Sequence, residues 1–117
     1  MEFLSEEYFT ALAARLSAAP LDEEADRVAI GQLVTDAPGG DVAWTVHLGG
    51  GEPARLERDS LAGADVTLVE DYATARALAG GEGVADALRA GKIKVRGDAN
   101  TLVAHYARLA ALVAVAP

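Results

Sequence analysis

Hydrophobic positions along the chain follow two periods. Within residues 27–71 and again within 91–98, apolar side chains alternate with polar ones, as in strands with one buried face. Elsewhere they recur at spacings of three and four residues, as in helices. The resulting order is helix, three-strand meander, fourth strand, two short helices, fifth strand and long helix. We therefore expect an α+β fold in which helices cover one face of a five-stranded sheet.

The five predicted strands cover residues 27–36, 41–50, 54–59, 64–71 and 91–98. In the second strand, the alternation points Trp44 and Val46 inward and His47 outward. In the first strand Ile30 shares a face with Gln32, and Gly31 is a candidate bulge that would reset the alternation. Ile30, Trp44 and Val46 are therefore expected on the inner face.

Four helices are predicted around these strands, with Ser5, Asp71 and Asp98 (or Asn100) as N-caps of three of them and Gly91 ending the helix over 84–90. Their apolar faces contain Phe9, Leu12 and Leu16, then Val84 and Leu88, and finally Leu102, Tyr106, Leu109 and Val113. The last of these faces is wider than a normal amphipathic stripe. It suits the buried side of a core helix, a dimer face, or the wall of an apolar cavity.

Length and charge exclude several classes of function. The 117 residues suit a single domain spanning 1–117, and a net charge of −8 argues against nucleic acid as a partner. Cysteine is absent, which excludes disulfides and thiolate sites and fits a reducing cytoplasm. No apolar run approaches the ~20 residues that span a bilayer, and the acidic start lacks the features of a secretory signal. We expect a soluble, cytoplasmic protein.

No group of residues specifies a reaction. The only histidines, His47 and His105, lack the spacing of metal ligands, and we interpret both as surface residues. The carboxylates of residues 21–26 and 69–71 are expected to cap helices and to keep turns soluble. We therefore predict no catalytic residue, no metal and no cofactor.

Small apolar side chains dominate the composition. Hydrophobic residues make up 51% of the chain but aromatic residues only 5%, so there are few large side chains to fill the interior. Alanine-rich helices with a filled core would account for this balance. The alternative is an interior that is not filled by its own side chains and has room for an apolar guest.

A recognisable pattern occupies residues 65–106. An Asp-hydrophobic-Thr strand and a short helix precede Ala-x-x-x-Gly-Lys-hydrophobic-Lys-hydrophobic-x-Gly-Asp and a last helix. The matching residues are Asp65, Val66, Thr67, Ala87, Gly91, Lys92, Ile93, Lys94, Val95, Gly97 and Asp98. Through them the chain resembles the type-two sterol carrier protein (sterol-transfer) family. The N-terminal half resembles this family mainly in element order, including a tryptophan in the second strand.

The resemblance implies a mostly antiparallel sheet of order 3-2-1-4-5 that encloses an apolar cavity with its helices. It implies a stand-alone, non-catalytic carrier, of a kind common in bacteria, for fatty acid, fatty acyl-CoA or phospholipid. A sterol is less expected, because most bacteria lack sterols. The expected cavity walls are Phe9, Leu12, Leu16, Ile30, Trp44, Val46, Val84, Leu88, Leu102, Tyr106, Leu109 and Val113. Gln32 would meet the polar end of the ligand or lie at the surface beside the bulge.

Two interpretations remain open for Lys92, Lys94 and Arg96, which gather in one predicted strand and include the only two lysines. At a sheet edge they would discourage pairing with other chains. They could also form a basic stripe that touches anionic membrane headgroups. Besides a lipid or acyl ligand, a membrane surface or a lipid-metabolising enzyme is thus an expected partner. The alternative function is an interaction or dimerisation module with a filled core, and either function suits a monomer or a homodimer.

Overall fold

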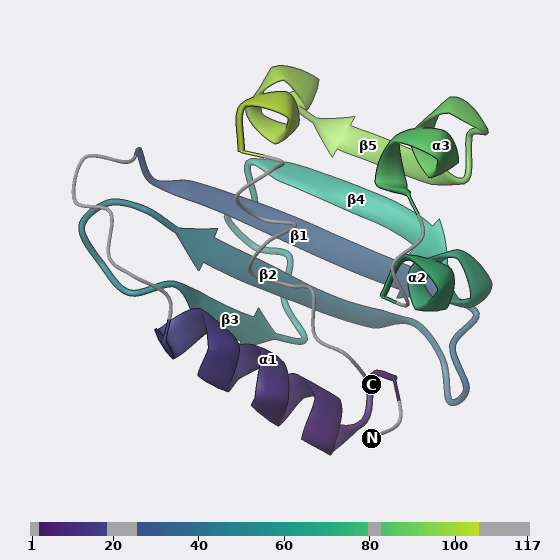
Figure 1. The fold of residues 1–117 in the computed structure, drawn as a ribbon, viewed down its shortest axis with the longest axis horizontal. Coiled ribbons are helices and arrows are strands. Elements are labelled where there is room, and N and C mark those ends of the chain that lie inside the picture. The colour runs from purple at the N-terminus through teal and green to yellow at the C-terminus, as the bar shows by residue number, and fades with distance from the viewer. Residues whose placement is uncertain (1–2, 19–25, 80–82, 106–117) are drawn as a thin grey trace.

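The computed structural model describes residues 3–18, 26–79 and 83–105, which form a layered α+β structure (Figure 1). The elements are α1 (Glu6–Ala18), β1 (Val28–Thr35), β2 (Val42–Leu48), β3 (Arg55–Arg58), β4 (Val66–Asp71), α2 (Tyr72–Ala79), α3 (Val84–Arg89) and β5 (Ile93–Gly97). A further helix is described over residues 99–105. All five predicted strands are confirmed, as is each predicted helix within the described ranges.

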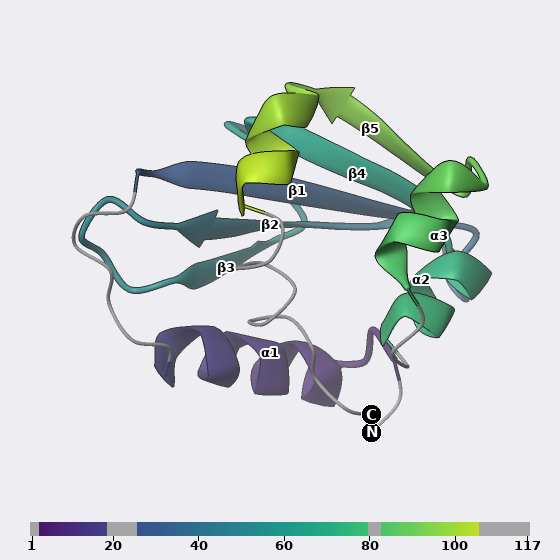
Figure 2. The same ribbon diagram turned by 45° about the horizontal axis from the view of Figure 1, so that its top comes forward.

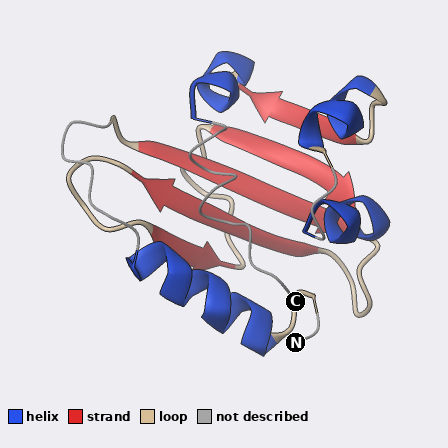
Figure 3. Ribbon diagram, viewed as in Figure 1, coloured by secondary structure: helices blue, strands red, loops and turns tan. Residues whose placement is uncertain are grey.

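The five strands form one sheet in the order β3-β2-β1-β4-β5. Three of its pairings are antiparallel, and the central pairing of β1 with β4 is parallel. The described helices lie on one face of this sheet, which the two ribbon views show from different angles (Figures 1 and 2) and the colouring by element makes plain (Figure 3). The predicted fold class and strand order are confirmed, and β5 is an edge strand.

Asp65 begins the parallel pairing at the centre of the sheet. Its carboxylate oxygen Oδ2 accepts a hydrogen bond from the Ala29 N–H at 2.7 Å, and its own N–H donates to the Ala29 carbonyl at 2.8 Å. The next residues, Ile30 and Val66, are then opposite each other. Because both bonds involve one residue on each strand, they fix the register of β4 against β1.

The bulge predicted at Gly31 is wrong, because β1 pairs with β2 without interruption along its length. A Cβ atom at residue 31 would lie 2.9 Å from both Leu61 Cδ2 and Thr67 Oγ1. Glycine therefore lets the connection between β3 and β4 pack against the outer face of β1. The alternation is not reset, and Gln32 lies on the same inner face as Ile30.

Side-chain oxygens cap three helices, as predicted. The bonds are Tyr8 N–H to Ser5 Oγ (3.2 Å), Thr74 N–H to Asp71 Oδ1 (2.7 Å) and Asn100 N–H to Asp98 Oδ1 (2.9 Å). The predicted stop at Gly91 is also confirmed, since its φ is 73°. The following Lys92 N–H donates to the Ala87 carbonyl at 2.9 Å and closes the turn. This bond fixes the backbone of Lys92 at the junction of α3 and β5.

An aromatic chain joins α1 to the sheet and to the start of α2. It contains five of the six aromatic residues of the protein, with ring centroids separated by 5.3 Å (Trp44–Phe9), 5.5 Å (Phe9–Tyr8), 5.0 Å (Tyr8–Phe3) and 5.7 Å (Phe3–Tyr72). The Arg58 guanidinium lies 4.1 Å from the Phe9 ring centroid and donates to both carboxylate oxygens of Glu6 at 2.9 Å. These contacts hold α1 over the β3 edge of the sheet.

Gly97→Ala should destabilise the protein more than Gly39→Ala, measured as the free energy of unfolding in urea. The two glycines have similar φ values of 97° and 92°, so each alanine incurs left-handed strain of about 1–3 kcal/mol. Only at residue 97 would the new Cβ also meet backbone, at 2.6 Å from the Asp65 carbonyl oxygen, whereas nothing lies within 4 Å of one at residue 39. Equal losses would show that β5 does not depend on close approach to Asp65.

Candidate functional site

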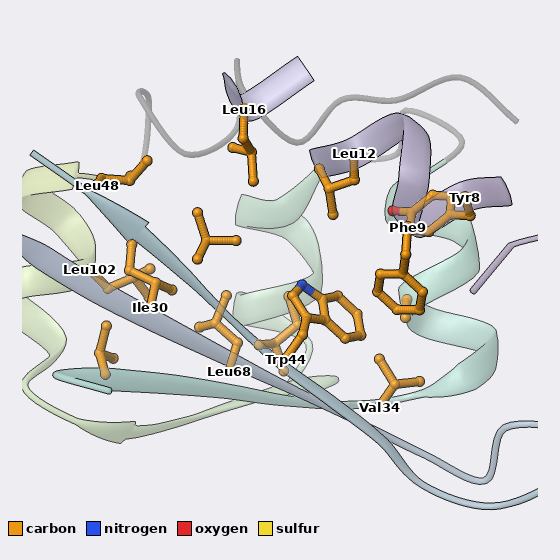
Figure 4. Close-up of a cluster of buried hydrophobic side chains, with 14 of the residues drawn as sticks. Tyr8, Phe9, Leu12, Leu16, Ile30, Val34, Trp44, Leu48, Leu68 and Leu102 are labelled. Carbon is orange, nitrogen blue, oxygen red and sulfur yellow. The ribbon is translucent and has the colours of Figure 1, made fainter. Parts of the chain in front are cut away.

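Seven of the predicted wall residues meet in one buried cluster between the sheet and the helices (Figure 4). They are Phe9, Leu12, Leu16, Ile30, Trp44, Val46 and Leu102, with exposed fractions of 5% or less. Leu88 lies apart from them at the surface. Tyr106, Leu109, Val113 and the side chain of Val84 lie outside the described residues. The cluster is therefore drawn from α1, β1, β2 and the helix over 99–105, as expected, while its role as a cavity wall stays a prediction.

Packing varies across this inner layer. Leu16, Ile30 and Val46 have exposed fractions of 0%, so protein atoms enclose them completely. Gln32 retains accessible surface although it lies on the central strand, paired with Trp44 on one side and Leu68 on the other. The centre of the inner face is thus both polar and partly open.

The Trp44 indole N–H is an unpaired donor inside the cluster. The side chain is 3% exposed, and the nitrogen has no hydrogen-bond partner among the described residues. In Figure 4 this nitrogen points away from the sheet and into the cluster. A buried donor without a partner costs about 1–3 kcal/mol. An acceptor supplied by a bound molecule would remove that cost.

Glu70 corrects the expectation that the carboxylates of residues 69–71 only cap and solubilise. Asp71 does cap α2, but Glu70 is 6% exposed and lies on the inner face with Val66 and Leu68. Desolvation by burial, with a smaller contribution from the Asp71 charge, raises the pKa of Glu70 from 4.5 to about 7. Burial also raises the pKa of Tyr8, and the nearby Glu70 charge adds to this shift. A titratable carboxyl group therefore lies beside the apolar layer.

His47 is less solvated than its strand position suggests. It points to the outer face, as predicted, but only 13% of its side chain is exposed, so its interpretation as a solvated surface residue is wrong. Its Nε2 lies 3.5 Å from Glu57 Oε1, on the neighbouring strand. This position is on the opposite face from the apolar cluster, so His47 takes no part in the candidate site.

A cavity of about 480 Å³ lies between α2 and α3. Its apolar lining includes Ala73, Ala77, Leu78, Ala87 and Ala90, and Thr74, Asp86 and Lys92 contribute a hydroxyl, an acidic and a basic group. The volume is within the range of small-molecule sites. Sequence patterning did not predict this cavity, because it depends on how closely two short helices approach each other.

The three clustered bases do not share one environment. Lys94 and Arg96 are exposed on the edge strand β5, where either of their predicted roles stays open. Lys92 precedes the strand and lines the cavity between α2 and α3. Among residues 3–18, 26–79 and 83–105, no group of acidic, histidine or cysteine side chains could hold a metal ion. No helix in the described ranges is long and apolar enough to cross a membrane.

An open five-stranded sheet with one central parallel pair and helices on a single face defines a specific class of α+β fold. Solved structures show that this is the fold of sterol carrier protein 2, and the resemblance predicted from residues 65–106 is confirmed. No protein-family model and no curated protein matches the sequence.

Three solved proteins illustrate the likeness. Palmitated sterol carrier protein 2 like 2 from Aedes aegypti is 24% identical, with a TM-score of 0.67 and coverage of 97% of both chains. Its crystal structure is 25% identical, with a TM-score of 0.65 and coverage of 91% of this chain and 93% of that one. A crystal structure of sterol carrier protein 2, with no organism named, is 19% identical, with a TM-score of 0.68 and coverage of 99% and 100%. A variant of the sec-alkyl sulfatase Pisa1, from a Pseudomonas species, is 21% identical, with a TM-score of 0.61. This match covers 89% of this chain but only 16% of the sulfatase chain.

Glu70→Gln should flatten the pH dependence of stability between pH 4.5 and 7. Because the folded state raises the pKa of Glu70, it holds the proton more tightly than the unfolded chain does. The contribution of Glu70 to stability is therefore fullest below pH 4.5 and falls as pH rises to 7, by about 3 kcal/mol. Glutamine cannot ionise, so the variant should be the more stable protein at pH 8. Urea titrations across this range test the expectation, with Glu7→Gln on the exposed side of α1 as control, and an unchanged slope would contradict it.

Proposed function

We propose that the protein binds and carries a hydrophobic lipid without chemically altering it. The observation that carries this proposal is the match, along 97% of both chains, to a palmitated sterol carrier protein 2 like 2. Fatty acid, fatty acyl-CoA and phospholipid are the proposed ligands, with a sterol less favoured. The cytoplasm is the proposed location.

The proposed ligand lies between the sheet and the helices. The seven clustered wall residues supply apolar surface there, and the partly open Gln32 and the unpaired Trp44 N–H supply polar contacts to its head or carbonyl group. Burying ~12 methylenes at roughly 0.8 kcal/mol each gives a gross gain on the order of 10 kcal/mol. Association costs of similar size oppose it, so we expect micromolar affinity.

An interaction module with a filled core is the second candidate function. The complete enclosure of Leu16, Ile30 and Val46 favours it, because these side chains already have protein neighbours on every side. Val103, on the helix over 99–105, is 78% exposed and offers an apolar contact to a partner. The sulfatase that contains this fold within a longer chain suggests an enzyme as that partner.

Native mass spectrometry of gently purified protein separates the two functions. A carrier should show added mass corresponding to an acyl lipid, and titration with sodium palmitate should change the emission of Trp44, the only tryptophan. Trp44 is 3% exposed and lies within the cluster, so its emission reports directly on the inner layer. Protein that carries no lipid, ignores palmitate and self-associates would reject the carrier. Truncation before Leu109 should then abolish self-association.

Charge reversal at Lys94 and Arg96 tests a membrane role for the exposed bases. Each base near an anionic surface contributes about 1 kcal/mol, so the double variant K94E/R96E should slow lipid transfer from anionic vesicles more than tenfold. Transfer from neutral vesicles should not change. If both vesicle types give wild-type rates, the two bases serve only to protect the β5 edge from other chains.

A further inference from the structure

We propose that the cavity between α2 and α3 binds the anionic head of a single-chain amphiphile, with the Lys92 ammonium as its counter-charge. The proposal rests on the proposed function and names the ligand class and the position of its charged end. Carboxylate and phosphate heads share the required chemistry: a negative charge on one acyl or alkyl chain. A neutral chain of equal length lacks it.

Four alanines and Leu78 supply the apolar part of the cavity lining, and Thr74, Asp86 and Lys92 supply polar groups. Ala73 and Ala77 lie one turn apart on α2, while Ala87 lies on α3 and Ala90 is the C-cap of that helix. Methyl groups are too short to close the gap between the helices, which leaves about 480 Å³. The alanine methyl groups leave room for a hydrocarbon chain and offer it apolar contacts.

The cavity adjoins the apolar layer. Ala87 lines the cavity and is also a member of the buried cluster, and Leu78 lines it while packing against that cluster. A chain whose head lies at Lys92 can therefore direct its methylenes past these two side chains toward the inner layer. The cavity then serves as one end of the proposed lipid site.

Lys92 is positioned for this role by its backbone, and its side chain is exposed at the cavity. Its N–H closes the turn after α3, which fixes its Cα at the cavity. Among the described residues its ammonium group forms no ion pair, whereas the neighbouring Asp86 carboxylate pairs with Arg89 at 3.4 Å. The other nearby carboxylate, Asp71, accepts a hydrogen bond from the Thr74 N–H at 2.7 Å. Its hydrogen bonds from Thr74, with a smaller contribution from the Lys92 charge, lower the pKa of Asp71. An anionic head would thus give Lys92 a partner at ion-pair distance, which neither carboxylate provides among the described residues.

Calorimetric titration with sodium laurate, dodecyl phosphate and 1-dodecanol below their aggregation limits tests the proposal. Wild-type protein should bind both anions about tenfold more tightly than the alcohol. Lys92→Gln should lose that tenfold preference and leave dodecanol affinity unchanged. Arg55→Gln, which removes one positive charge from the exposed β3 edge, is the matched control and should preserve the preference.

Ala77→Leu tests the cavity itself, with circular dichroism used to verify folding. The larger side chain should fill the space and weaken the binding of all three ligands about tenfold. Ala104→Leu, on the exposed side of the helix over 99–105, should leave their binding unchanged.

If wild type, K92Q and A77L all bind laurate equally, the proposed head site is wrong while the carrier function stands. If wild type binds none of the three ligands, both proposals fail. If K92Q and R55Q lose the preference for anions equally, the loss comes from the change in net charge, and the role proposed for Lys92 is wrong.

Discussion

The parallel pairing of β1 with β4 is the constraint on which the rest of the structure depends. Two hydrogen bonds between Asp65 and Ala29 set its register, and every other strand is added outward from this pair by antiparallel pairing. Gly97, at the end of β5, pairs with Val66 directly beside Asp65. The Asp-hydrophobic-Thr and Gly-Asp parts of the sequence pattern, more than thirty residues apart, therefore meet at one end of the sheet.

A parallel pair at the centre decides where the helices can lie. The chain crosses the outer face of the sheet between β3 and β4, where Gly31 makes room for Leu61 and the Thr45 hydroxyl donates to the Ser60 carbonyl at 2.7 Å. With that face partly covered by a connection, the described helices pack on the other face. Apart from Gln32 and Glu70, the inner layer is consequently apolar from α1 to β4, and an aromatic chain from Trp44 to Tyr72 ties its elements together.

Local signals predicted much of this arrangement. Period-two alternation located the strands, and Ser5, Asp71, Asp98 and Gly91 marked helix ends because capping depends only on neighbouring residues. The errors arose where distant segments meet. Gly31 is a site of close approach rather than a bulge, which only the β3–β4 connection reveals. Glu70 follows the inward alternation of Val66 and Leu68, so the strand pattern could have identified its burial had its charge not suggested a turn.

A packed apolar layer adjoins a cavity that Lys92 lines, and we propose that a lipid chain occupies the space under the helices. Nuclear Overhauser effects between uniformly ¹³C-labelled palmitate and the protein measure this most directly. We expect contacts from the palmitate methylenes to Trp44, Leu68 and Ala87. Contacts confined to exposed positions such as Val103, with none to Trp44 or Ala87, would contradict it and leave this fold as a surface for other proteins.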